Sequence, residues 1–181
     1  MLEIDGFFVK INFARDIIGS IVEHCKDKFN PEKEGGVFVI LDSKTGVLVF
    51  ACLVGKASPE KAKKYFEVAL EKANRVFVEK LQTSADSRDP DNGKWGGAIR
   101  GKVFIYSFSG LTEAQDEVCS IAACMDLNDE LPYILLSLES RIINNQTGED
   151  VFEIISDLKS NSREDLIIFS HNFFILKDRA K

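Results

Sequence analysis

The chain contains few of the residues on which catalytic and metal-binding motifs depend. Its 181 residues include two histidines, one tryptophan and four cysteines, Cys25, Cys52, Cys119 and Cys124. The cysteines show no C-x-x-C spacing, and each lies in a segment whose apolar pattern would bury it. We therefore expect free thiols in a reducing compartment rather than a disulfide framework.

Basic residues and long hydrophobic runs are also scarce. With 23 basic and 29 acidic residues, the net charge of -6 provides no field that would attract a phosphate backbone or an anionic membrane. No apolar run approaches the ~18 residues of a membrane span, and the amino terminus does not resemble a signal peptide. The sequence thus predicts a cytoplasmic protein with neither a nucleic acid nor a membrane as partner.

Catalytic motifs are missing as well. Two histidines and scattered serines do not make a recognisable Ser-His-Asp pattern. The stretch from Gly93 to Gly97 lacks the residue order of a phosphate-binding loop. The acidic residues Asp116 and Glu117 fit the first turn of a helix, and Asp42 fits a turn. The sequence therefore favours a binding role over an enzymatic one.

What is present is an alternation of helices and hairpins. Apolar spacing predicts a helix over Asn12–Phe29, and "VFVILDSKTGVLVFACLV" predicts a hairpin of strands 37–41 and 47–54. Ser58-Pro59 begins a second helix that extends to Phe77, with a charged face that includes Glu71 and Arg75 and is expected to face solvent. A polar surface loop, residues 82–94, follows.

The second half of the chain repeats the hairpin and helix. A strand pattern over Gly97–Phe108 is interrupted by a turn or bulge at Gly101-Lys102, and a capping box at Thr112 and Gln115 starts a helix that reaches Met125. Beyond it lie an apolar segment at 131–138, a short helix at 149–158 and an apolar run at 166–176. Because tight turns join antiparallel strands, we predict an α+β fold with an antiparallel sheet flanked by helices.

Two stretches resemble the GlcG/HbpS-like family. "VFVILDSKTGVLVFACLVGKASPEKAKKYFEVALEKANRVF" is similar to its hairpin and lysine-rich helix, and "GGAIRGKVFIYSFSGLTEAQDEVCSIAA" to its later hairpin, Ser-Gly turn and closing helix. The family includes accessory proteins of glycolate utilisation, extracellular haem-binding proteins and domains of some cobalamin adenosyltransferases. The resemblance covers residues 10–127 and implies a profilin-like fold, homo-oligomers, and a small-ligand or haem site near the glycine-rich loops. We expect one domain over 1–181, in which 128–181 is an extension packed on this core.

The candidate ligand residues are Trp95, Gly96, Gly97 and Arg100. A tryptophan followed by glycines could stack on a flat ligand such as haem, and an arginine could pair with a ligand carboxylate. The alternatives are that Trp95 attaches the loop to the domain and that Arg100 is an outward strand residue. His24 and His171 are candidate axial donors to haem iron, although each also fits a structural or surface position.

Three functions follow as hypotheses. The first is a small-ligand-binding accessory or sensor module, with haem or a related flat molecule as ligand. The second is an enzyme that degrades haem or acts on a small acid. The third is a non-catalytic assembly or adaptor protein in which the apolar tail from Leu131 to Leu176 covers a sheet edge or pairs with another subunit.

Overall fold

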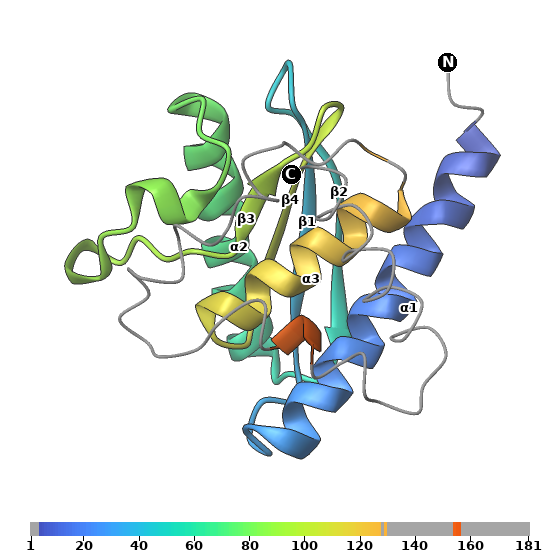
Figure 1. Cartoon of the computed structure of the whole chain (residues 1–181), viewed down its shortest axis with the longest axis vertical. Coiled ribbons are helices and arrows are strands. Elements are labelled where there is room, and N and C mark those ends of the chain that lie inside the picture. Colours follow the sequence, from blue (N-terminus) through green and yellow to red (C-terminus); the bar gives the residue numbers. More distant parts are fainter. Residues whose placement is uncertain (1–3, 128, 130–153, 157–181) are drawn as a thin grey trace.

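The computed structural model of the chain describes residues 4–127, 129 and 154–156 (Figure 1). Along the chain the elements are α1 (Ile4–Lys28), β1 (Gly35–Asp42), β2 (Leu48–Gly55), α2 (Pro59–Val78), the 3-10 turns η1 (Ser84–Ser87) and η2 (Pro90–Asn92), β3 (Ala98–Arg100), β4 (Phe104–Ser109) and α3 (Glu113–Asp126). None of the helices among these residues is long and apolar enough to cross a membrane.

The strands form one antiparallel sheet in the order β2-β1-β4-β3 (Figure 1). Alternate residues of β1 face opposite sides: Phe38 and Ile40 pack with α1 and α3, whereas Val37, Val39 and Leu41 pack with α2. The sheet thus lies between α2 on one face and the pair α1 and α3 on the other. The predicted α+β class, with helices flanking an antiparallel sheet, is confirmed.

The hairpin of β1 and β2 is built on the turn that the sequence predicts. The Asp42 carboxylate accepts hydrogen bonds from the backbone N–H groups of Lys44 (2.9 Å) and Thr45 (2.7 Å) and from the Thr45 hydroxyl (2.9 Å). These bonds lower the pKa of Asp42. Gly46 completes the turn with a positive φ of 70°.

Helix α1 begins earlier than predicted, at Ile4 rather than Asn12. Ile11 is buried, and Phe7 packs against the ring of Phe104 with centroids 5.4 Å apart. Both residues extend the three-and-four spacing of Ala14 and Ile18 toward the amino terminus. The prediction started too late because the adjacent Phe8 and Val9 are apolar and exposed, which obscures the periodicity.

The second hairpin and α3 agree closely with the pattern. The predicted strand 97–108 is a short β3 and a longer β4, which are joined by a turn at Gly101, where its N–H donates to the Phe104 carbonyl (2.8 Å). The capping box of Thr112 and Gln115 is present. Helix α3 is buried around its whole circumference from Ala114 to Cys124.

Most of the predicted extension lies outside the described residues. The apolar segments 131–138 and 166–176 fall there entirely, and of the predicted helix 149–158 only 154–156 is described, as helix. Ile154 and Ile155 are buried in the same cluster as α1 and α3. The described residues all join this one sheet and its covering helices.

Candidate functional site

The predicted ligand residues lie along one segment, and their backbone is bonded to the protein itself. Trp95 is 38% exposed, and its carbonyl accepts a bond from Nη2 of Arg75 (2.6 Å). The Gly96 N–H donates to Oε2 of Glu113 (2.6 Å). Glu113 also accepts from Nε of Arg88 (2.9 Å), which ties the loop to the start of α3.

Only a glycine fits at position 97, because atoms of α3, rather than a ligand, lie against its Cα. Its φ is +114°, and a Cβ placed there would lie 2.6 Å from the Cβ of Asp116. The Gly97 carbonyl accepts a hydrogen bond from the buried hydroxyl of Ser120 (2.7 Å). The glycine thus allows the chain entering β3 to pack directly on a helix.

Arg100 holds the end of α2. Its guanidinium donates to the carbonyls of Leu81 (3.0 Å), Ser43 (3.1 Å) and Val76 (2.7 Å). Burial lowers the pKa of Arg100. Val76 lies in the last turn of α2, Leu81 follows that helix and Ser43 lies in the turn after β1, so Arg100 links these three segments. A ligand role for Trp95, Gly96, Gly97 and Arg100 stays a prediction.

A buried ion pair links α2 to α3 and was not anticipated from the sequence. Nζ of Lys72 lies 2.7 Å from Oδ2 of Asp116 and 3.1 Å from the Phe108 carbonyl, and the other carboxylate oxygen accepts the Leu111 N–H (3.0 Å). Burial raises the pKa of Asp116 more than Lys72 and the N–H of Leu111 lower it. The sequence does contain a sign that Lys72 is buried. Lys72 follows Ala69 by three residues and precedes Val76 by four, which places it on the apolar face of α2.

Arg75 lies on the face of α2 that the sequence predicts to be exposed to solvent. In the structure its side chain is buried, so this prediction is wrong for Arg75. Besides Glu71 at 2.8 Å, it donates to the carbonyls of Ser84 (2.7 Å) and Ser87 (3.0 Å). A charged side chain that binds several backbone carbonyls explains how the polar loop keeps a fixed path without an apolar core of its own.

The candidate metal donors are not gathered into a site in the described part of the chain. His24 is half-buried, and burial lowers its pKa; His171 lies outside the described residues. Among the residues described, no group of three or more His, Cys, Asp or Glu side chains is placed to hold a metal ion.

The two edges of the sheet differ sharply. At the β3 edge the outward N–H of Arg100 donates to the Gln82 carbonyl (2.8 Å), and that of Ala98 donates to Oγ of Ser84 (2.9 Å). Thr83 forms an isolated bridge with Ile99. The loop after α2 therefore closes this edge as a further strand would.

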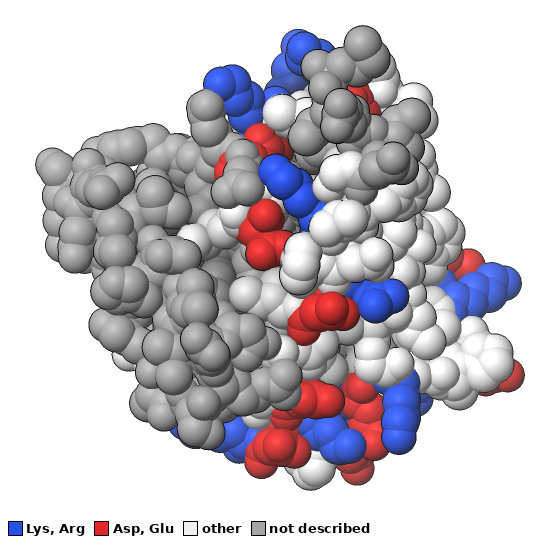
Figure 2. All heavy atoms as spheres, turned by 90° about the vertical axis from the view of Figure 1, so that its right-hand side faces the viewer, with Lys and Arg blue, Asp and Glu red and all other residues white. Residues whose placement is uncertain are grey.

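The β2 strand is apolar, and among the described residues its outer edge has no partner strand. Its sequence, LVFACLVG, has no charged residue and no proline, the features with which proteins usually protect an edge. Leu48 (44%), Val49 (39%) and Leu53 (44%) are exposed. Helix α2 packs mainly on β1, β4 and β3, so among the described residues no helix covers this face of β2 extensively. Figure 2 faces this side and shows an uncharged expanse broken by a few charged side chains.

The hydrogen-bond ladder identifies which groups point outward. One register extends from Ile40 opposite Phe50 to Gly35 opposite Gly55, and the N–H of Lys56 donates to the Glu34 carbonyl. Within this register Phe50, Cys52 and Val54 bond to β1, and Ala51 and Leu53 direct N–H and C=O away from it. No described residue bonds to these outward groups.

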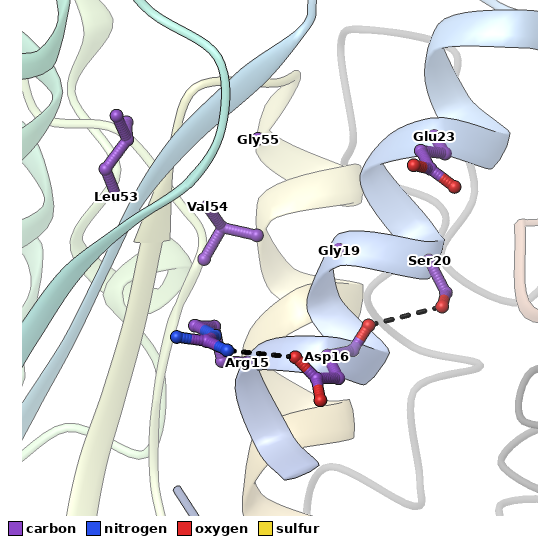
Figure 3. Close-up of a pocket in the computed structure, with 8 residues that line it drawn as sticks. All are labelled: Arg15, Asp16, Gly19, Ser20, Glu23, Leu53, Val54 and Gly55. Carbon is purple, nitrogen blue, oxygen red and sulfur yellow. Dashed lines mark hydrogen bonds and ion pairs between the residues drawn. The ribbon is translucent and has the colours of Figure 1, made fainter. Parts of the chain in front are cut away.

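A groove separates α1 from the second half of this strand (Figure 3). It has a volume of about 470 Å³ and is lined by Arg15, Asp16, Gly19, Ser20, Glu23, Leu53, Val54 and Gly55. Figure 3 shows Val54 pointing toward α1 and Leu53 away from it. The glycines Gly19 and Gly55 supply no side chain to fill the space, so α1 does not close over the edge here.

The described residues thus form an α+β fold in which the chain's own loop closes the β3 edge and no described strand pairs with the outer edge of β2. Comparisons with protein-family models, with curated proteins and with solved structures find no match.

Proposed function

We propose that this chain is a non-catalytic assembly protein that binds a partner protein by strand addition at β2. The observation that carries the proposal is the contrast between the two edges: the β3 edge is closed by the chain's own loop, whereas the outer edge of β2 is apolar and has no partner among the described residues. Backbone groups of an added strand would bond to Ala51 and Leu53, and its apolar side chains would cover those of β2.

The chemistry of the edge supports this function over catalysis. The grooves that border β2 and α2 contain no described cluster of metal-binding side chains. The buried carboxylate of Asp116 is bonded to Lys72 and Leu111 and serves to join α2 and α3. An eight-residue apolar strand, in contrast, is a surface that proteins seldom leave exposed without a partner.

Amide hydrogen exchange tests the proposal. In a dilute sample that light scattering shows to be monomeric, the amides of Ala51 and Leu53 should exchange almost without protection. The neighbouring amides of Cys52 and Val54, which bond to β1, should be protected by orders of magnitude and serve as internal controls. Protection of Ala51 and Leu53 in the monomer would mean that the edge is already satisfied within the chain and would refute the proposal.

A proline variant gives the second readout. Ala51→Pro removes an outward N–H and no bond to β1, so the monomer should lose little stability. Cys52→Pro is the matched variant, because it removes an N–H that bonds to β1 and should destabilise the hairpin strongly. Equal losses in the two variants would place both residues in bonded positions and contradict an open edge.

A further inference from the structure

The loop that closes the β3 edge contains the one Asn-Gly pair of the sequence, Asn92-Gly93. Both residues are exposed, and a Cβ placed on Gly93 would have no atom within 4 Å. Asparagine is among the thermolabile residues of proteins, and a glycine after it leaves the next backbone nitrogen unshielded by a side chain. We infer that Asn92 is a site of spontaneous deamidation and that the Asp89 carboxylate controls the rate of this reaction.

The reaction joins the Gly93 nitrogen to Cγ of Asn92. A base in the solvent takes the proton of this nitrogen, whose electron pair forms the new bond, and the side-chain nitrogen takes a proton and leaves as ammonia. Water then opens the cyclic imide at either of its carbonyl groups, which leaves an aspartate or an isoaspartate in place of the asparagine. The net change consumes one water molecule and releases one ammonia, so no oxidant or reductant takes part.

In the closed loop, hydrogen bonds hold both reacting groups. The Gly93 N–H donates to the Pro90 carbonyl (3.0 Å), and Nδ2 of Asn92 donates to Oδ2 of Asp89 (2.6 Å). The first bond keeps the proton on the attacking nitrogen. The second restricts the side-chain rotation that brings Cγ of Asn92 to that nitrogen. The closed turn therefore slows deamidation, and Asp89 supplies half of this protection.

The turn that protects Asn92 is a small one. The 3-10 turn η2 is three residues long, none of them is buried, and its N-cap, Asp89, makes no side-chain capping bond. Two backbone bonds of 2.9 Å between Asp89 and Lys94 close it. A segment with so few buried contacts opens locally while the sheet stays folded. Asn92 thus reacts through the open turn, more slowly than in a free peptide.

The product of the reaction does not rebuild the same turn. A carboxylate at position 92 has no N–H to donate, and it would meet the Asp89 carboxylate where a donor and an acceptor now lie 2.6 Å apart. Asp91 adds a third negative charge between them in the sequence. Deamidation therefore replaces an attraction that holds η2 closed by a repulsion that favours the open turn.

Peptide mapping of aged protein by mass spectrometry tests the inference. After incubation at mildly alkaline pH, the tryptic peptide that contains position 92 should carry aspartate and isoaspartate, with unaged protein as the blank. Asn74 is the internal control, because it is also exposed but precedes Arg75 on α2, and it should stay intact. Asp89→Ala should deamidate about fivefold faster than wild type, since Asn92 then loses its hydrogen bond to a charged group. A synthetic peptide of residues 86–98 gives the rate without the turn.

Two results would overturn the inference. An intact Asn92 in the aged protein, under conditions in which the synthetic peptide deamidates, would overturn the site itself. Equal rates in wild type and Asp89→Ala would overturn the control by Asp89. Neither result bears on the proposed function, because this turn lies on the loop at the β3 edge and strand addition is proposed at β2.

Amide hydrogen exchange tests the effect of the new charge. The amides of Gly93 and Lys94 donate to the carbonyls of Pro90 and Asp89 in the closed turn. They should exchange several-fold faster in Asn92→Asp than in wild type, because the turn opens more often. Asn92→Ser is the matched control, since it removes the amide without adding a charge. Equal exchange in the two variants would contradict the repulsion between positions 89 and 92.

Discussion

Nζ of Lys72 on α2 and Oδ2 of Asp116 on α3 lie 2.7 Å apart, although these helices pack on opposite faces of the sheet. The contact is possible because β3 begins only at Ala98, opposite Ser107, so no residue of β3 stands opposite Phe108. The Lys72 ammonium reaches the Phe108 carbonyl and the Asp116 carboxylate through this opening.

We expect removal of one partner of this pair to be more damaging than removal of both. Lys72→Met leaves a buried carboxylate without its cation and should lower the free energy of unfolding by about 3–5 kcal/mol. In Lys72→Met/Asp116→Asn the amide oxygen still accepts the Leu111 N–H and no charge is buried, so about 1 kcal/mol or more should return. Urea denaturation measures both, and a double variant that is no more stable than Lys72→Met would contradict this account.

The carboxyl group of Asp116 should also make the stability of the folded protein depend on pH. Burial raises the pKa of Asp116 above the value of 3.8 that applies in the unfolded chain. The Asp116 carboxyl therefore keeps its proton to a higher pH in the folded state than in the unfolded state. The stability that this proton contributes is lost as the pH rises from 3.8 through the pKa of the folded state. The stability of wild type relative to Asp116→Asn should fall over that window and then level off. A difference that grows with pH in denaturation curves would reverse the sign and refute the assignment.

The two positive-φ glycines of the loop should respond differently to alanine. Gly97→Ala places a Cβ against Asp116 and forces strain at φ +114°, so a loss of more than about 2 kcal/mol is expected. Gly93→Ala has a φ of +72° but nothing within 4 Å of the added atom, and should cost only about 1 kcal/mol. Thermal unfolding compares them; similar losses would show that close packing at Gly97 is unimportant.

Arg75 should determine the order of the loop between α2 and β3. Arg75→Met removes the donors to the carbonyls of Ser84, Ser87 and Trp95 and should speed trypsin cleavage after Arg88 and Lys94. Lys64→Met, an exposed change on the same helix, is the control. Unchanged cleavage in Arg75→Met would mean that other contacts hold the loop.

The haem hypothesis has a direct test. Titration of the chain with haem should give a shifted Soret band at stoichiometric protein if Trp95 and its neighbours bind the macrocycle, and Trp95→Ala should weaken the binding. Absence of the band at tens of micromolar protein would make the prediction wrong. This outcome would leave the proposal for β2 unaffected, because Trp95 lies on the loop that closes the opposite edge.

The predictions from sequence succeeded where a local pattern determines structure. The Asp42 turn, the Ser58 cap and the capping box of Thr112 and Gln115 depend on residues a few positions apart, and all are present. Arg75 is predicted by its charge to face solvent, and no pattern singles out Lys72, whereas partners distant in sequence bury both. The position of β2 at the edge of the sheet could not be predicted either, because strand order depends on pairing between segments far apart in the chain.

The sheet order also has a consequence for how the chain folds. Strands β1 and β2 are neighbours in sequence and form their hairpin from local contacts, whereas the pairing of β1 with β4 must wait for α2 and the loop to be placed. The apolar β2 edge would then exist before the central strand is complete on its other side. During synthesis the nascent hairpin would have two unprotected edges instead of one, and slow docking of β4 would be the step at which aggregation competes with folding.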